Sequence, residues 1–90
     1  MITNLNLLPL KTRAIIIGIN EKACKLNPYP PSFLEKRLLE MGFVEGTPIT
    51  ILHQAPFTKD PIIIQLRNSR IALRRNEAEC IEVSYNDKGE

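Results

Sequence analysis

The segment Arg37 to Leu52, RLLEMGFVEGTPITIL, changes its hydrophobic period halfway along, and this change constrains the fold more than any other feature. Before Gly42 the apolar residues recur at helical spacing, whereas after Gly46 a β-branched run begins. Gly42 suits the left-handed position that follows a helix, and Phe43 is then placed to pack back on Leu38. The chain is therefore expected to pass directly from a short helix into a strand.

The helix is expected to run from Ser32 to Met41. The Ser32 hydroxyl is placed to cap the first turn, and Glu35, three residues later, to complete a capping box. The apolar residues at helical spacing are Phe33, Leu34, Leu38 and Met41. A helix of about two and a half turns is too short to be stable alone, so it must dock on other structure.

That other structure is predicted to be β-sheet. Five short strands are expected, at Arg13–Ile19, Thr47–Ala55, Ile62–Arg67, Arg70–Arg74 and Cys80–Ser84. In the first, Ile15, Ile17 and Ile19 are predicted to share a face, and Gly18 suggests a bulge. Asn68-Ser69 is the expected connection of a tight hairpin, and a single helical turn from Asn76 to Glu79 precedes the last strand.

These elements describe a mainly β protein, a small and partly open five-stranded barrel like that of SH3 domains, with the helix covering one opening. A chain of 90 residues has room for one such domain, expected over residues 1–84 with a frayed tail at 85–90. The loop from Glu21 to Pro31 contains NPYPP and is interpreted as a stiff connector, or alternatively as a PxxP ligand for another protein's groove.

The composition favours a cytoplasmic protein. The apolar N-terminal stretch is interrupted by Asn4, Pro9 and Lys11, which argues against a signal peptide or a membrane span. The two cysteines, Cys24 and Cys80, are far apart in sequence and are interpreted as reduced thiols, with Cys80 a small buried residue at a strand start.

Residues for catalysis are scarce. The single histidine, His53, is predicted to share a face with isoleucines, where a structural or partly exposed role is favoured over a base or a ligand. Paired CxxC or HxxxH spacing for a zinc site is absent from the sequence, as is a glycine-rich phosphate loop. The prediction is a non-enzymatic protein without a cofactor or a metal site.

A basic stretch keeps one alternative open. Arg67 and Arg70 flank the predicted hairpin turn, and Arg74 and Arg75 follow, so a small nucleic-acid-binding barrel using this stretch is the second hypothesis. Such barrels usually add aromatic side chains on which bases stack, and none lies between Arg67 and Arg75. A solvated face, partly paired with the carboxylates of residues 77 and 79, is the favoured interpretation.

The C-terminal half of the chain, from Arg37 onward, resembles the FeoA family, the small cytosolic proteins of bacterial ferrous iron transport. The motifs that carry the resemblance are Leu38 to Phe43, Gly46-Thr47, Ala55-Pro56, Asp60-Pro61, Ile71 to Arg74 and Ala78 to Val83. The resemblance implies an SH3-like barrel that binds the cytosolic, GTP-binding part of the FeoB membrane ferrous iron transporter. It implies no nucleic-acid partner and no direct insertion into the membrane.

Four residues are candidates for partner binding. Leu39 falls outside the helical stripe, and Phe57 lies in the turn between the second and third strands, where a large apolar side chain has no local use. We expect Leu39 and Phe57 to anchor the partner, with Arg67 and Arg70 at the rim. The alternative, that Leu39 and Phe57 extend the core, is left open by the sequence.

Overall fold

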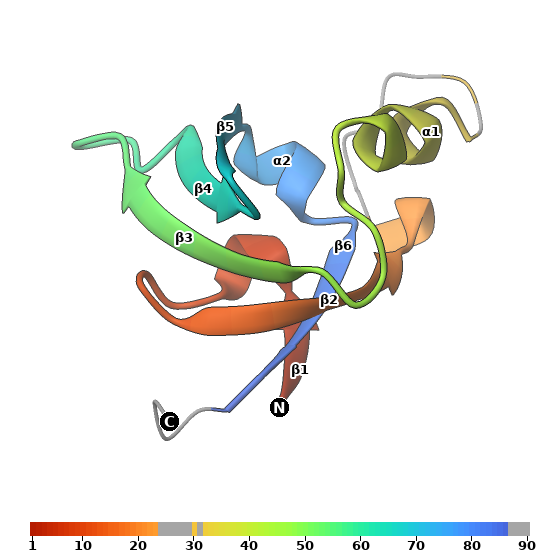
Figure 1. The fold of residues 1–90 in the computed structure, drawn as a ribbon. Helices are drawn as coiled ribbons and strands as arrows, with labels where there is room; N and C mark the ends of the chain where they lie inside the picture. The colour runs from red at the N-terminus through yellow and green to blue at the C-terminus, as the bar shows by residue number, and fades with distance from the viewer. Residues whose placement is uncertain (24–29, 31, 87–90) are drawn as a thin grey trace.

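The computed structural model, which describes residues 1–23, 30 and 32–86, is a six-stranded antiparallel sheet that curls around one core (Figure 1). The strand order is β1-β6-β2-β3-β4-β5. The strands are β1 Ile2–Asn4, β2 Arg13–Ile19, β3 Pro48–Gln54, β4 Ile62–Leu66, β5 Ser69–Leu73 and β6 Ile81–Tyr85. The helices are α1 Phe33–Glu40 and α2 Arg75–Ala78, with the 3-10 turns η1 Leu5–Leu7 and η2 Glu21–Ala23.

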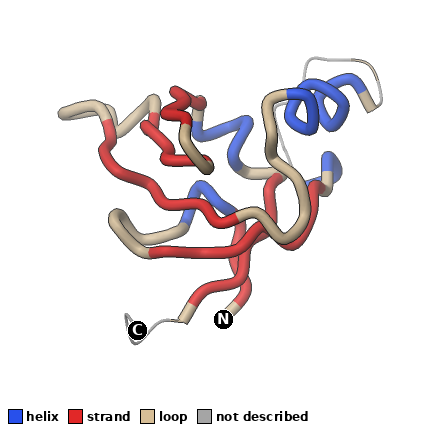
Figure 2. The backbone as a smooth tube through the Cα atoms, viewed as in Figure 1, coloured by secondary structure: helices blue, strands red, loops and turns tan. Residues whose placement is uncertain are grey.

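The predicted mainly β, SH3-like fold is confirmed, including the short helix and the single helical turn before the last strand. Figure 2 shows the strands curving around one interior, with α1 beyond them at the upper right. The sheet has one strand more than the five predicted. Strand β1 spans three residues without a hydrophobic alternation, and only its pairing with β6 makes it a strand.

The predicted end of α1 is confirmed. Gly42 has φ of 106°, and the backbone N–H of Phe43 donates to the carbonyl of Leu38 at 3.0 Å, as in a Schellman motif. Both Phe43 and Leu38 are fully buried, so the contact that closes the helix also belongs to the core. A Cβ atom on Gly42 would lie 3.3 Å from Cδ2 of Leu66, which adds a steric reason for glycine.

The predicted capping of α1 by the Ser32 side chain is wrong. Ser32 has φ of 66° and makes no side-chain cap, because a capping residue needs extended backbone to aim its hydroxyl at the first turn. Instead, Oε2 of Glu21 accepts a hydrogen bond from the backbone N–H of Glu35 at 3.2 Å. Glu21 in η2 therefore adds a negative charge at the helix N-terminus, beside that of Glu35 in the first turn.

Phe33 is the one predicted stripe residue that does not face the core. Leu34 and Leu38 are buried and Met41 packs against the core, whereas 48% of Phe33 is exposed. Residues spaced i, i+4 and i+7 share one helical face, and Phe33 precedes that series by one position.

The predicted bulge in β2 is confirmed, but Ile15 and Ile19 do not share a face as predicted. The pairing register between β2 and β6 shifts between Ile16 and Gly18. Ala14 and Ile16 face the core, and Ile15 is 39% exposed. Ile19, which follows the shift, packs against the core, because the extra residue of the bulge reverses the alternation of faces.

Strand β3 and the hairpin after β4 also depart from prediction. A second register shift, between Ile51 and His53, turns His53 to the exposed side, away from the isoleucines. The hairpin connection is Arg67-Asn68 rather than Asn68-Ser69, because Leu66 pairs with Ser69. Arg67 has φ of 55° in this turn, a conformation that glycine adopts most readily.

The core is a single cluster. Its largest fully buried side chains are Phe43, Leu5, Ile16, Leu34, Leu38, Ile49, Ile51, Ile62, Ile64, Leu73, Ile81 and Val83. Cys80 is buried and not in a disulfide, as predicted for a small apolar residue beside β6. Cys24, the NPYPP segment except Pro30, and residues 87–90 of the predicted tail lie outside the described residues.

Candidate partner-binding surfaces

Leu39 lies on the outer face of α1 and is 43% exposed. It lines a shallow pocket of about 380 Å³ together with Ser32, Glu35, Lys36 and Glu40. Leu39 is therefore a half-exposed apolar residue surrounded by polar side chains, as expected for a small anchoring site.

Phe57 is the most exposed large apolar side chain in the described part of the chain, with 99% of its surface accessible. It lies in the β3–β4 loop, residues 55–61, which projects at the upper left of Figure 1. Phe57 also has φ of 69°, and Lys59 has φ of 61°. Left-handed backbone at a non-glycine residue costs about 1–3 kcal/mol and persists only where neighbouring contacts hold it.

Those contacts form a network within the loop. The backbone N–H of Lys59 donates to the carbonyl of Ala55 at 2.9 Å, and the N–H of Ala55 donates to the carbonyl of Pro61 at 3.0 Å. The Thr58 hydroxyl donates to the carbonyl of Asp60 at 3.0 Å. The loop that presents Phe57 is thus ordered before any partner binds.

Arg75 holds this loop to the body of the protein, a role that the sequence did not suggest. Its guanidinium donates to the carbonyls of Lys59 and Asn6 and to Oε1 of Gln54, and its backbone N–H donates to Asp60. The partners come from the N-terminal turn η1, from β3 and from the β3–β4 loop. No local pattern marks an arginine whose partners lie so far apart in sequence.

Arg67 and Arg70 lie together at the β4–β5 turn, as predicted. Gln65 lies between them: its side-chain amide donates to the Arg67 carbonyl at 2.7 Å and accepts from Nε of Arg70 at 3.5 Å. The Arg67 guanidinium also donates to the Thr47 hydroxyl at 3.4 Å. Both arginines are exposed, yet each is oriented by a neighbour.

The four predicted partner-binding residues do not form one patch. Helix α1 and the β3–β4 loop lie at opposite ends of the molecule in Figure 1, which separates Leu39 from Phe57. Arg67 follows Leu66, which pairs with Ile49 at the start of β3, whereas Phe57 follows the end of β3. At about 3.3 Å per residue, the length of β3 separates these two sites by roughly 20 Å.

The basic stretch of the nucleic-acid hypothesis is divided as well. Arg75 is used for internal hydrogen bonds, and Arg74 lies at the end of β5 opposite the turn that holds Arg67 and Arg70. The predicted pairing of this stretch with Glu77 is replaced by another one. Oε2 of Glu77 lies 2.8 Å from Nη1 of Arg37 on α1, and its Oε1 accepts from the backbone N–H of Arg74.

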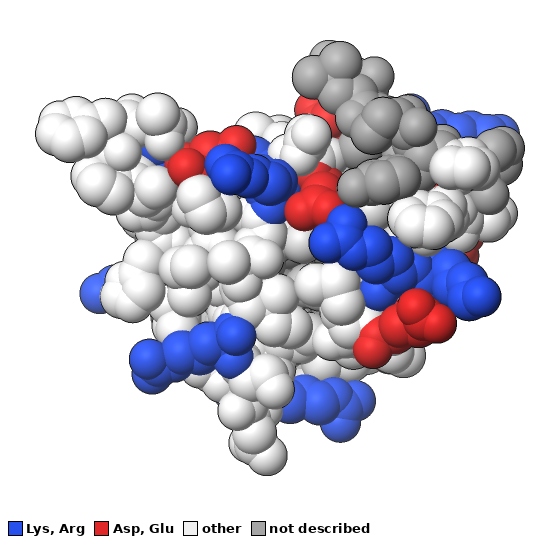
Figure 3. Space-filling view, turned by 90° about the horizontal axis from the view of Figure 1, so that it is seen from above, with Lys and Arg blue, Asp and Glu red and all other residues white. Residues whose placement is uncertain are grey.

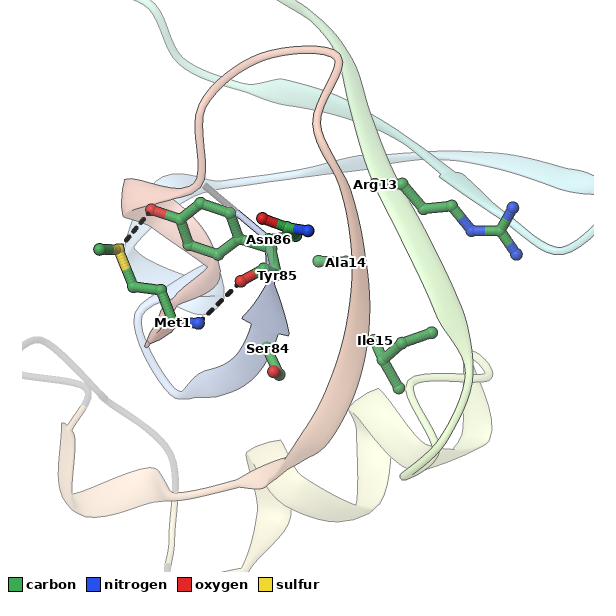
Figure 4. A pocket seen from close by; sticks show the side chains of 7 residues that line it. All are labelled: Met1, Arg13, Ala14, Ile15, Ser84, Tyr85 and Asn86. Carbon is green, nitrogen blue, oxygen red and sulfur yellow. Dashed lines mark hydrogen bonds between the residues drawn. The ribbon is translucent and has the colours of Figure 1, made fainter. Parts of the chain in front are cut away.

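Another pocket, of about 490 Å³, lies where the ends of β1, β2 and β6 meet (Figure 4). On one side, the amino group of Met1 donates to the carbonyl of Tyr85 at 2.8 Å, and the Tyr85 hydroxyl donates to Sδ of Met1 at 3.0 Å. On the other side, Arg13 and Ile15 project from β2 away from Met1 and Tyr85 in Figure 4. Arg13 therefore borders this pocket but extends beyond it.

Metal binding and membrane insertion are two further properties on which the described residues bear. Across residues 1–23 and 32–86, no group of three or more His, Cys, Asp or Glu side chains is placed to hold a metal ion. Within the same ranges, no helix has the length and apolar character needed to cross a membrane.

Comparisons with known proteins agree with the geometry. A family model described as the FeoA domain matches residues 3–85. A Porphyromonas gingivalis protein named Fe(2+) transport protein A/Fe(2+) transporter FeoB fusion protein is 46% identical over 48 residues, which are 53% of this chain. The match spans only 6% of that relative's length.

Solved structures give the same result. A FeoA-like protein from Clostridium acetobutylicum superposes with a TM-score of 0.76 and 33% identity, over 93% of this chain and 86% of that one. FeoA from Stenotrophomonas maltophilia, solved with zinc and described as a prokaryotic SH3 domain protein, gives a TM-score of 0.69 and 27% identity. That match covers 94% of this chain and 91% of the other.

Proposed function

Because this chain belongs to the FeoA family of non-enzymatic accessory proteins of ferrous iron transport, we propose that it binds the cytosolic, GTP-binding part of a FeoB-type membrane transporter and thereby modulates ferrous iron uptake. The observation that carries this proposal is the fusion relative, whose name places the two proteins in one chain. Domains joined in one chain are held at high effective concentration, which favours contact between them. Such a contact must be made by side chains on the surface of this domain.

Leu39 and Phe57 are proposed as the apolar anchors of that contact. Leu39 and Phe57 lie at opposite ends of the molecule in Figure 1, so a partner that uses both anchors must extend across the face between them. An interface of standard size covers about 800 Å² on each partner. The ordered loop around Phe57 supports its role, because an anchor that is already in position loses little conformational entropy on binding. Aromatic side chains are also enriched among residues that dominate binding energy.

A test in cells separates this role from a structural one. In a strain that lacks this chain, ferrous iron uptake is measured after complementation with the wild type, Leu39→Gln or Phe57→Ser. We expect the wild type to restore uptake, and each variant to restore much less while keeping a near-native melting temperature. The matched controls are Val44→Gln, at 44% exposure, and Leu7→Ser, at 68% exposure, which should behave as the wild type.

Two results of this experiment would contradict the proposal. Wild-type levels of uptake from both anchor variants would place the partner surface elsewhere. Unchanged uptake in the deletion strain itself would remove the role in iron transport altogether.

A further inference from the structure

A basic row crosses the outer face of the sheet. Arg13 on β2 pairs with Thr50 on β3, Thr50 pairs with Gln65 on β4, and Gln65 pairs with Arg70 on β5. Residues in register across a sheet share one face. The neighbours on either side, such as Ala14 and Ile49, are buried in the core, so this row faces solvent.

The row borders a cleft. A pocket of about 340 Å³ is lined by Arg13, Thr50, Gln65, Arg67 and Asn68, with Pro48 and Ile49. Arg13 also lines the pocket of Figure 4, so the two hollows meet at this side chain. Between them, Ile15 pairs with the exposed Pro48 and gives the surface an apolar strip.

Within residues 1–23, 30 and 32–86, no carboxylate lines either hollow. Among the described residues, the salt bridge that the structure records joins Arg37 to Glu77, on the helices, and Arg13, Arg67 and Arg70 form none. In Figure 3, the acidic side chains gather over the upper and right parts of the view, while Lys and Arg groups at the lower left have none beside them. Like charges that gather without counter-charges repel one another, so this arrangement favours an anionic partner.

The backbone conformation of Arg67 gives an independent reason to expect an anionic partner here. It is held at φ of 55°, at the first position of a two-residue hairpin turn where glycine is the residue without strain. Its guanidinium is aimed by the Thr47 hydroxyl, and Thr47 is buried. A strained residue that carries a positioned charge points to a function for that charge.

We propose that the cleft lined by Arg13 and Arg67, with Arg70 beside it on the same row, is a docking site for an acidic segment of the transporter's cytosolic region, a proposal that rests on the proposed function. The segment's carboxylates pair with the three guanidinium groups, and an apolar side chain contacts Ile15 and Pro48. The charges supply orientation and speed of association, and the apolar contact lengthens the lifetime of the complex.

The experiment measures binding of the full chain to the purified cytosolic region of the transporter by calorimetry, at low and physiological salt. We expect Arg13→Gln combined with Arg70→Gln to raise Kd about tenfold at low salt, and by less at physiological salt where screening is stronger. The control is Arg74→Gln, an exposed arginine at the other end of the same hairpin, which should leave Kd within about twofold.

The variant Arg67→Gly separates the effect of the Arg67 charge on binding from any effect on the stability of the fold. Glycine relieves the strain at this position, so the melting temperature should not fall, yet Kd should rise several-fold because the positioned charge is lost. An unchanged Kd in both the double variant and Arg67→Gly, or an equal rise in Arg74→Gln, overturns the cleft.

Two further experiments show whether a negative result contradicts the proposed function or the docking cleft. If the wild type does not bind the transporter region, the proposed function fails, and a short glutamate-rich peptide then tests the cleft by itself. Binding of that peptide by the wild type but not by the double variant supports an acidic ligand, and no binding overturns it. Mobility shifts of duplex DNA or RNA that depend on Arg13 and Arg70 would identify a nucleic-acid surface and also overturn the proposal.

Discussion

Gly42 and Phe57 both hold positive φ, but they do so for opposite reasons. Gly42 ends a helix at a point where its missing Cβ lets the chain turn into the barrel against Leu66. Phe57 also has a positive φ, although its side chain is bulky and is exposed to solvent. The first conformation serves the fold, and the second is maintained at the expense of stability.

Gly42→Val should lower the free energy of unfolding by about 1–3 kcal/mol, because a β-branched residue resists positive φ. Chemical denaturation measures the change. Gly18→Val is the control, since a Cβ atom on Gly18 meets nothing within 4 Å and its φ is not in the left-handed region. Equal losses in the two variants would show that Gly42 has no special role.

Phe57→Gly should leave the free energy of unfolding unchanged or raise it by up to about 1 kcal/mol, although a large apolar side chain is removed. The relief of strain offsets the greater entropy that glycine gives the unfolded chain. Leu38→Ala, which removes a fully buried side chain, should instead cost about 2–5 kcal/mol. A large loss in Phe57→Gly would mean that this side chain packs on the protein after all.

At the scale of single elements, the sequence predicted those features that depend on neighbouring residues in the chain. The end of α1 was predictable because Met-Gly-Phe encodes the cap, the reversal and the buried contact within three residues. The faces of β2 and β3 were not, because each bulge inserts a residue that reverses the alternation after it. The start of α1 was missed since its capping group, Glu21, belongs to another element.

Arg75 joins elements that no local pattern connects, and its loss should loosen them. Arg75→Met keeps the length of the side chain but leaves the carbonyls of Lys59 and Asn6 without their donor. We expect a loss of about 1–3 kcal/mol in stability and faster hydrogen exchange at the amides of Ala55 and Lys59. Arg74→Met, the adjacent exposed arginine, should leave both measurements near the wild type. Unchanged exchange in the Arg75 variant would show that the loop orders itself.

On the scale of the whole molecule, a core that involves nearly every element fixes the relative positions of the candidate surfaces. The resemblance to FeoA predicted the fold and the family, because both follow from the order of motifs along the chain. The sequence could not predict that Leu39 and Phe57 lie at opposite ends, or that Arg13 joins Arg67 and Arg70. Those relations depend on strand register and on two bulges.

The central claim is that this small barrel acts by binding the transporter. Titration of the transporter's cytosolic region with the full chain, followed by calorimetry at physiological salt, tests it most directly. The account predicts saturable binding with one site per cytosolic region, weakened by Phe57→Ser and by the double variant Arg13→Gln and Arg70→Gln. The absence of any binding by folded wild-type protein would contradict the account.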